Sequence, residues 1–327
     1  MKRLFFVAVL IAAAVAFFTF TTSDHYLFIP DRARPVDPLI KVAGEEPDPK
    51  DANGDGVYMV DILIRKASLL ERYFPSIVSG ATLIPGDALN PEGASDEQRE
   101  QEGKNQMSRS QEVAAAVALK SLGHRIEVTG LGARIESVVP DEPADGVLEA
   151  GDAIVEANGE PVKDGAGLVR AMKDVEPGDD VGLVVLRDDK RMTVTVGTAP
   201  SPDDPERAFM GVQVTDAATF DLPVEITIDV GDIGGPSAGL PFALDIVDEL
   251  GEDVDDGRRV VATGELSLDG TVSAIGGVKQ KTIGAREAGA DIFLVPDANA
   301  AEARKYADGL EIVAVSTFKE ALAALEG

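Results

Sequence analysis

VEITIDVGDIGGPSAGLPFALDIVDEL, residues 224–250, predicts a strand, a glycine-rich turn and a helix in direct succession. The alternation of apolar and polar residues in its first part is typical of a half-buried strand. After the turn, Leu240, Leu244 and Val247 recur at a helical spacing and would share one buried face. Ser237 therefore lies at the start of a helix, where the first backbone N–H groups have no partner within the helix. Such groups can stabilise a developing oxyanion, so Ser237 is a candidate nucleophile.

A serine nucleophile needs a base, and the histidines of this chain are poorly placed to supply one. G-P-S-A-G, residues 235–239, also fits the G-x-S-x-G turn of α/β-hydrolases, in which the catalytic histidine follows the serine. The chain has 2 histidines, His25 and His124, and both precede Ser237. This order excludes an esterase of that type, and a chymotrypsin-like site would be left with His124, which lies in a separate module. A desolvated lysine is the remaining base.

Two lysines downstream compete for that role. They lie in G-G-V-K-Q-K, residues 276–281, at the predicted start of a second helix. Lys279 and Lys281 would point about 200 degrees apart around that helix, so only one of them can face Ser237. Spacing alone does not choose between them.

Three motifs, in this order, resemble the proteolytic domain of Lon proteases. They are GGPSAG at residues 234–239, ATGELSLDGTVSAIGGVKQK at 262–281 and AGADIFLVP at 288–296. In that family the catalytic serine lies in the P-S-A-G element, and the resemblance places the catalytic lysine directly after G-G-[LV]. Ser237 and Lys279 occupy those positions here.

The resemblance also implies roles for residues around the dyad. Thr263 occupies the family's T-G-E position and is expected to orient the lysine, while Gly235 and Ala238 are expected to support the site. One position departs from the family, because Gly234 stands where Asp usually precedes G-P-S-A-G. This difference puts the positioning of the substrate in doubt, but not the dyad itself.

Residues 124–197 have a different pattern, with short predicted strands and one predicted helix. Their sequence resembles the PDZ signature L..GD.I...NG, in the run from Leu148 to Gly159. The resemblance implies a groove between a strand and the helix that binds extended C-terminal peptides. The candidate carboxylate-binding loop is Gly130, Leu131, Gly132 and Ala133, with Ile135 on the groove strand and the helix at residues 165–172 opposite. These glycines fit a simple turn equally well.

The start of the chain predicts a membrane anchor. Residues 4–20 follow Lys2 and Arg3 and are apolar apart from Thr19. No small-x-small cleavage site comes after them, which favours an uncleaved anchor over a cleaved signal peptide. By the positive-inside rule, the N-terminus would be cytoplasmic and everything after residue 22 extracytoplasmic. The expected location is the cell membrane, with a single pass.

Between the anchor and the PDZ-like region, the pattern is mixed. Residues 51–56 are similar to the front half of an EF-hand loop, but Ile62 stands at the position of the bidentate Glu, so no metal site is predicted. A strand is expected over residues 56–64, a polar loop over 87–106 and an alanine-rich helix over 108–123. That helix resembles an early helix of the Lon proteolytic domain.

Composition limits the partners. The formal net charge is −28, with 58 acidic residues against 30 basic ones, which disfavours binding to nucleic acid. The absence of cysteine excludes disulfides and thiolate metal sites. G-x-x-x-x-G-K-[ST] does not occur in the sequence, and no cofactor is predicted. Proteins or peptides are the expected substrates, and a homo-oligomer is possible because Lon-like domains often form rings.

Together these features predict an α+β fold in which a PDZ-like β-rich domain is inserted into a Lon-type proteolytic domain, after one N-terminal transmembrane helix. The expected parts are anchor and stem, a segment with an early strand and helix of the protease domain, the PDZ domain and the domain with the catalytic dyad, over residues 1–30, 31–123, 124–197 and 198–327. The predicted function is ATP-independent endoproteolysis of unfolded or tail-exposed extracytoplasmic proteins. A non-catalytic adaptor or holdase of the same build is the alternative.

Overall fold

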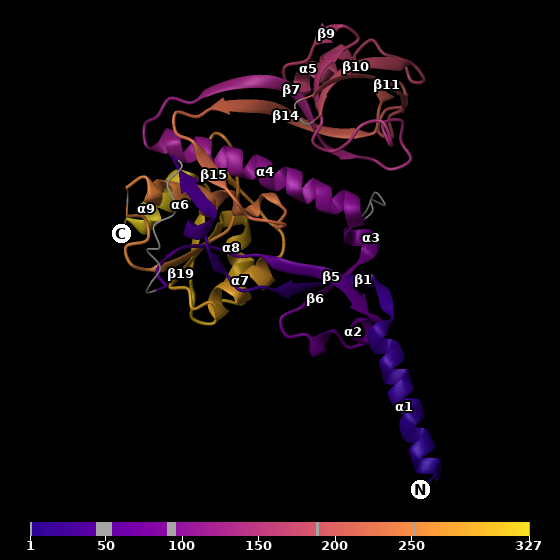
Figure 1. Cartoon of the computed structure of the whole chain (residues 1–327), viewed down its shortest axis with the longest axis vertical. Coiled ribbons are helices and arrows are strands. Elements are labelled where there is room, and N and C mark those ends of the chain that lie inside the picture. Colours follow the sequence, from indigo (N-terminus) through magenta and orange to yellow (C-terminus); the bar gives the residue numbers. More distant parts are fainter. Residues whose placement is uncertain (1, 44–53, 90–95, 188–189, 252, 327) are drawn as a thin grey trace. The chain divides into compact units, whose positions relative to one another are not determined.

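The computed structural model describes residues 2–43, 54–89, 96–187, 190–251 and 253–326 (Figure 1). The chain forms two compact units. The first unit contains residues 1–91 and 237–327, and the second contains residues 92–236. The N-terminal and C-terminal segments therefore fold together, although more than a hundred residues separate them in the sequence.

The first unit contains most of the helices. In chain order its elements are α1 (Lys2–Phe20), β1 (Thr22–Pro30), β2 (Arg34–Pro35), η1 (Asp37–Leu39), β3 (Ile40–Val42), β4 (Gly56–Met59), β5 (Ile62–Ser68), α2 (Leu69–Tyr73), η3 (Pro75–Ile77), β6 (Thr82–Pro85), α3 (Gly86–Leu89), α6 (Gly239–Glu249), β16 (Arg259–Ala262), β17 (Glu265–Leu266), β18 (Val272–Ser273), α7 (Val278–Glu287), β19 (Ile292–Pro296), α8 (Asp297–Ala303), β20 (Glu311–Val315) and α9 (Phe318–Leu325).

The central sheet of the first unit has the strand order β2-β4-β16-β19-β20. Its last four strands are parallel, and Val260 on β16 pairs with Val57 on β4 and with Ile292 on β19. Parallel sheets are covered on both faces, which accounts for the continuous apolar runs in these strands. Phe242 of α6 and Phe293 of β19 are fully buried in this unit. Burial of each such side chain contributes about 1.5–3 kcal/mol to the free energy of unfolding.

The strand predicted over residues 56–64 is two strands. β4 ends at Met59, and β5 begins at Ile62 and pairs antiparallel with β1 in a separate three-stranded sheet of order β5-β1-β6. Val60 and Asp61 form the connection between the two sheets. Residues 51–53 of the EF-hand-like run lie outside the described residues, so its predicted lack of a metal stays a prediction.

α1 is a 19-residue helix that exposes large apolar side chains, among them Phe5, Phe6, Leu10 and Phe17. Within the described ranges, no helix combines the length and the hydropathy that crossing a membrane requires. The predicted transmembrane helix is not confirmed.

The second unit begins with the longest helix in the described part of the chain. Its elements are α4 (Asp96–Ser121), β7 (Glu127–Val138), β8 (Ala153–Ala157), β9 (Glu160–Pro161), α5 (Gly165–Ala171), β10 (Asp180–Arg187), β11 (Lys190–Gly197), β12 (Ala199–Pro200), β13 (Ala208–Phe209), β14 (Val212–Asp221) and β15 (Ile226–Ile228).

α4 corrects the loop that was predicted over residues 87–106. The helix begins at Asp96, so the polar stretch up to residue 106 is helical. Pairs one turn apart stabilise it, including Arg99 with Asp96 at 2.9 Å and Lys104 with Glu100 at 2.9 Å. The polar composition that favours a loop is also the composition of an exposed helix held by such pairs.

The main sheet of the second unit has the order β11-β10-β8-β7-β14, with β9 paired to β8. β10 and β11 form the predicted antiparallel hairpin, whose turn residues 188–189 lie outside the described residues. α5 packs beside β7. The core of this sheet includes Ile135, Ile154 and Leu183, all fully buried.

Candidate active site

Ser237 lies where the sequence places it, at the start of a helix. The short 3-10 helix η4 (Pro236–Ala238) leads directly into α6, and Ala238 is the residue that caps α6. The Ser237 carbonyl accepts hydrogen bonds from the Gly264 N–H at 2.9 Å and from the Thr263 hydroxyl at 3.2 Å. Ser237 is thereby tied to the segment that follows β16, while its side chain remains half-buried rather than covered.

Lys281 is the lysine that meets Ser237. Its Nζ lies 2.7 Å from the Ser237 Oγ, 3.2 Å from the Thr263 Oγ1 and 2.9 Å from the Val60 carbonyl oxygen. The Lys281 residue is 4% exposed. A serine hydroxyl, a buried amine and a threonine hydroxyl therefore converge inside the first unit.

The assignment of the base to Lys279 is corrected by this geometry. The Lys279 Nζ donates to the Ala81 carbonyl at 3.0 Å and to the Thr82 hydroxyl at 3.2 Å, on the other side of α7. The buried stripe of α7 explains the choice, because Val278, Lys281 and Ala285 follow one another at spacings of three and four residues. Val278 and Ala285 are part of the apolar core, so that stripe faces inward and Lys281 with it.

The signal that identifies Lys281 was present in the sequence. Val278 and Ala285 are apolar residues seven positions apart on a predicted helix, and Lys281 lies on the line that joins them. Lys279 lies off that line and next to Gln280, whose side-chain amide donates to the Gly80 carbonyl and the Thr82 hydroxyl. Helical phase, rather than distance from the double glycine, selects the lysine.

The surroundings of Lys281 make its amine easier to deprotonate than that of an exposed lysine. Burial lowers the pKa of Lys281 from 10.5 to about 8, and the carboxylate of Asp61 partly opposes this effect. Burial also raises the pKa of Asp61, against the attraction of Lys281 and of Arg34, whose guanidinium lies 3.3 Å away. Asp61 is a residue that the sequence analysis missed, and its signal was its position at the end of an apolar strand.

Hydrogen-bond counting shows how a neutral Lys281 is oriented. A neutral amine has two N–H donors and one lone pair. The Val60 carbonyl can only accept, and the Thr263 hydroxyl already donates to the Ser237 carbonyl, so its oxygen can accept from the amine. Both N–H donors are then used, and the lone pair is left for the Ser237 O–H. Thr263, which is 1% exposed, thus lies beside the lysine, as its predicted orienting role requires.

Gly234, the departure from the Lon pattern, has a steric explanation in the second unit. A Cβ at this position would lie 3.0 Å from the carbonyl carbon and 3.2 Å from the Cα of Gly103 in α4. The next residue, Gly235, has a φ of 100° and donates its N–H to the Gly103 carbonyl at 2.8 Å. Two backbones therefore approach closely here, and a side chain at position 234 would separate them.

The proposed carboxylate-binding loop is not a loop. Gly130, Leu131, Gly132 and Ala133 all lie inside β7, which pairs with β14 along this stretch through a register irregularity. Ala133 and Ile135 are fully buried in the apolar core, so neither side chain lines an open groove. The glycines allow close backbone approach instead, because a Cβ at Gly132 would collide with the Ile154 carbonyl.

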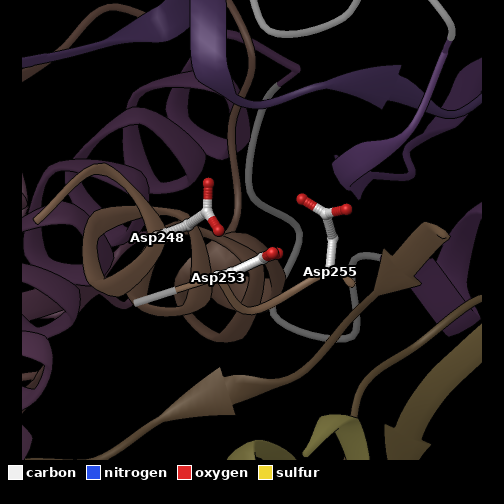
Figure 2. Close-up of side chains that lie close together, drawn as sticks. All are labelled: Asp248, Asp253 and Asp255. Atoms are coloured by element: carbon white, nitrogen blue, oxygen red, sulfur yellow. The ribbon is translucent and has the colours of Figure 1, made fainter. Parts of the chain in front are cut away.

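One group of carboxylates in the described ranges has the spacing of a metal site. The side chains of Asp248, Asp253 and Asp255 come from α6 and the loop after it, and their oxygen atoms lie within 4.8 Å of one another (Figure 2). They line a cavity of about 440 Å³ in the first unit. Each carboxylate also accepts a backbone N–H of the same loop, from Val254, Asp256 and Gly257. These bonds give the aspartates a structural role in the turn, and burial raises the pKa of Asp255.

Two family models match the chain. The PDZ domain model matches residues 120–198, and the model of the Lon protease (S16) C-terminal proteolytic domain matches residues 214–326. The second match contains Ser237, Thr263 and Lys281.

Three proteins with partial sequence similarity to this chain are two Lon proteases and a DegP-like endoprotease. Lon protease 2 of Bacillus subtilis is 42% identical over 90 residues, which cover 28% of this chain and 16% of that protein. A Lon protease of Roseiflexus castenholzii is 29% identical over 177 residues, covering 49% and 22% of the two chains. A probable periplasmic serine endoprotease DegP-like protein of Halomonas elongata is 42% identical over 95 residues, covering 28% and 20%.

The chain spans less than a quarter of the length of each of these relatives. The similarity therefore concerns single domains rather than whole proteins. Its two segments contain the features described above: Ser237 at a helix start and the buried Lys281 in one, and the sheet with α5 in the other. The chain carries a PDZ domain and a Lon-type C-terminal proteolytic domain.

Proposed function

We propose that this protein is a serine endopeptidase with a Ser-Lys dyad, in which Ser237 is the nucleophile and Lys281 is the general base. The observation that carries the proposal is the 2.7 Å contact between the Lys281 Nζ and the Ser237 Oγ. The buried amine, with a pKa lowered to about 8, can accept a proton near neutral pH.

The proposed reaction uses the Ser237–Lys281 pair in each of its steps. The Ser237 Oγ attacks the scissile carbonyl carbon while its proton moves to the Lys281 Nζ, and backbone N–H groups at the start of α6 stabilise the oxyanion. The intermediate collapses as the carbon–nitrogen bond breaks, and the protonated Lys281 gives its proton to the leaving amine. Water then attacks the carbonyl carbon of the acyl-enzyme while Lys281 takes a proton from it. The ester bond to the Ser237 Oγ breaks, Lys281 returns the proton to this oxygen, and the carboxylic acid product leaves.

The proposed role of the PDZ domain is to bind the substrates. The PDZ domain would bind C-terminal tails of unfolded or tail-exposed proteins and deliver them to the proteolytic domain, without ATP. A direct test compares binding of a labelled peptide with a free C-terminus and the same peptide with an amidated C-terminus by fluorescence anisotropy. Equal affinities would contradict recognition of the terminal carboxylate.

The proposed location is the cell membrane, with α1 as the anchor, the N-terminus cytoplasmic and the catalytic part extracytoplasmic. Lys2 and Arg3 precede the apolar residues of α1, whose large side chains are exposed. Membrane fractionation followed by protease treatment of intact cells would test both attachment and orientation. Recovery of the chain in the soluble fraction would overturn attachment.

The catalytic proposal is tested by cleavage of unfolded casein without nucleotide. Ser237→Ala and Lys281→Met should each lower the rate by about a thousandfold or more. Lys279→Met is the matched control, because it removes a lysine of the same helix that does not touch Ser237. If Lys279→Met abolished cleavage and Lys281→Met did not, the dyad would be wrongly assigned. Absence of cleavage by the unsubstituted chain would instead support an adaptor or holdase.

A further inference from the structure

A buried hydroxyl on α4 contacts the peptide group that precedes the nucleophile. The Ser110 Oγ donates a hydrogen bond to the Pro236 carbonyl oxygen at 3.0 Å, across 126 positions of sequence. Ser110 is 5% exposed and therefore has little access to water. Nothing in the dyad uses this residue, since Ser237, Lys281 and Thr263 are satisfied by one another and by Val60.

This hydrogen bond affects Ser237 because the Pro236 carbonyl is part of the peptide group that joins Pro236 to Ser237. This carbonyl and the Ser237 N–H are the two ends of one planar peptide group, so fixing the oxygen fixes the direction of the N–H. The Ser237 Cα is bonded to the same peptide group, so the orientation of the group also sets where the side chain that carries the Oγ begins. A hydrogen bond to the oxygen also polarises the group and makes its N–H a stronger donor.

Other contacts of α4 hold the same segment within the second unit. The Gly235 N–H donates to the Gly103 carbonyl at 2.8 Å, and Lys104 forms an ion pair with Asp232 at 3.2 Å. Gly103 and Ser110 are seven residues apart, so both lie on one side of the helix. Residues 232–236 are thereby held along α4 at three points.

We propose that Ser110 is a positioning residue for peptide cleavage, which orients the Pro236–Ser237 peptide group so that the Ser237 N–H and Oγ are correctly directed toward the scissile carbonyl. This inference rests on the proposed endopeptidase function. It differs from a purely structural role, in which the hydroxyl only satisfies a buried carbonyl and its loss lowers stability without changing the chemical step.

The test compares Ser110→Ala, Ser110→Cys and Ser108→Ala in the full chain with a fluorogenic peptide substrate. Ser108 is the matched control, because it lies on the same helix, is exposed and donates to the Lys104 carbonyl of that helix at 3.1 Å. Ser110→Cys keeps the size of the side chain and weakens the donor, so it guards against a variant that fails to fold. Circular dichroism at the assay temperature verifies that each variant is folded.

The expected result is a fall in kcat of about tenfold for Ser110→Ala, with KM within twofold of the unsubstituted chain. Ser110→Cys should be intermediate, and Ser108→Ala should be unchanged. The inference is overturned if kcat for folded Ser110→Ala or Ser110→Cys equals that of Ser108→Ala, or if only KM rises. Cleavage that depends on Ser237 leaves the endopeptidase proposal intact in that case, whereas no cleavage by the unsubstituted chain defeats both.

Discussion

In the proposed dyad, a single buried amine, that of Lys281, limits the pH range in which Ser237 can be activated. The protonated amine cannot accept the Ser237 proton, so activity requires the neutral form. Burial lowers the pKa of Lys281 to about 8, and cleavage should therefore rise with pH up to about that value and then level off. A rate of casein cleavage that is independent of pH between 6 and 9 would contradict the role of Lys281.

The charge of Asp61 shifts this profile. Its carboxylate raises the pKa of Lys281 and so opposes the effect of burial. Asp61→Asn removes the negative charge with little change in size, and the midpoint of the kcat/KM profile should then move to lower pH. A midpoint that stays in place or moves to higher pH would show that Asp61 does not act on the lysine through its charge.

Lys281 also links stability to pH. Below about pH 8 the amine is charged in the folded and unfolded chains, and keeping this charge in a buried site lowers the free energy of unfolding by ~3 kcal/mol. The penalty disappears as the pH rises from 8 to 10.5, because the folded chain loses its proton before the unfolded chain does. The stability of Lys281→Met relative to the unsubstituted chain should therefore fall by ~3 kcal/mol across this window. Urea unfolding at several pH values measures this difference, and a constant difference would contradict the lowered pKa.

At the scale of elements, α4 and the segment that it holds depend on a contact between two backbones. Gly103 and Gly234 approach closely enough that a side chain at position 234 forces one of them to move. This explains why the residue that is usual in Lon proteases is replaced by glycine here. Within the second unit, the same contact holds the segment that leads to Ser237 against α4.

Gly234→Asp introduces the residue that the family resemblance suggests, and it should nevertheless lower both activity and stability. The added Cβ would lie 3.0 Å from a backbone atom of α4, so kcat should fall severalfold and the chain should lose about 1–3 kcal/mol of stability. Gly182→Ala, in β10, is the control, since its nearest neighbouring atom would be 4.0 Å away. The measurements are the rate of casein cleavage and the thermal unfolding of both variants. A Gly234→Asp chain that is as active and as stable as the unsubstituted chain would refute the steric explanation.

At the scale of the whole molecule, the first compact unit is assembled from an N-terminal and a C-terminal segment of the chain. β4 lies between β2 and β16 in the central sheet, so residues 56–59 fill an interior position that the C-terminal segment cannot fill itself. A chain that begins at residue 198 exposes the edge of β16 and the apolar surface beneath β4. Such a chain should be unfolded or aggregated by circular dichroism and size-exclusion chromatography, and inactive on casein. A folded, active fragment would show that β4 is dispensable.

The sequence by itself determined the local features of this protein: the serine at a helix start, the strand and turn pattern of the PDZ region and the presence of two candidate lysines. These depend on short-range spacing, which the printed residues contain. The helical phase of Val278, Lys281 and Ala285 favours Lys281, and the tertiary structure decided that this lysine meets Ser237, through the face by which α7 packs on the core. It also decided that Gly130–Ala133 are strand rather than loop, through pairing with β14. The hydrogen bond of Ser110 to Pro236 and the charge interaction of Asp61 with Lys281 also depend on the tertiary structure, since each joins residues that are far apart in the sequence.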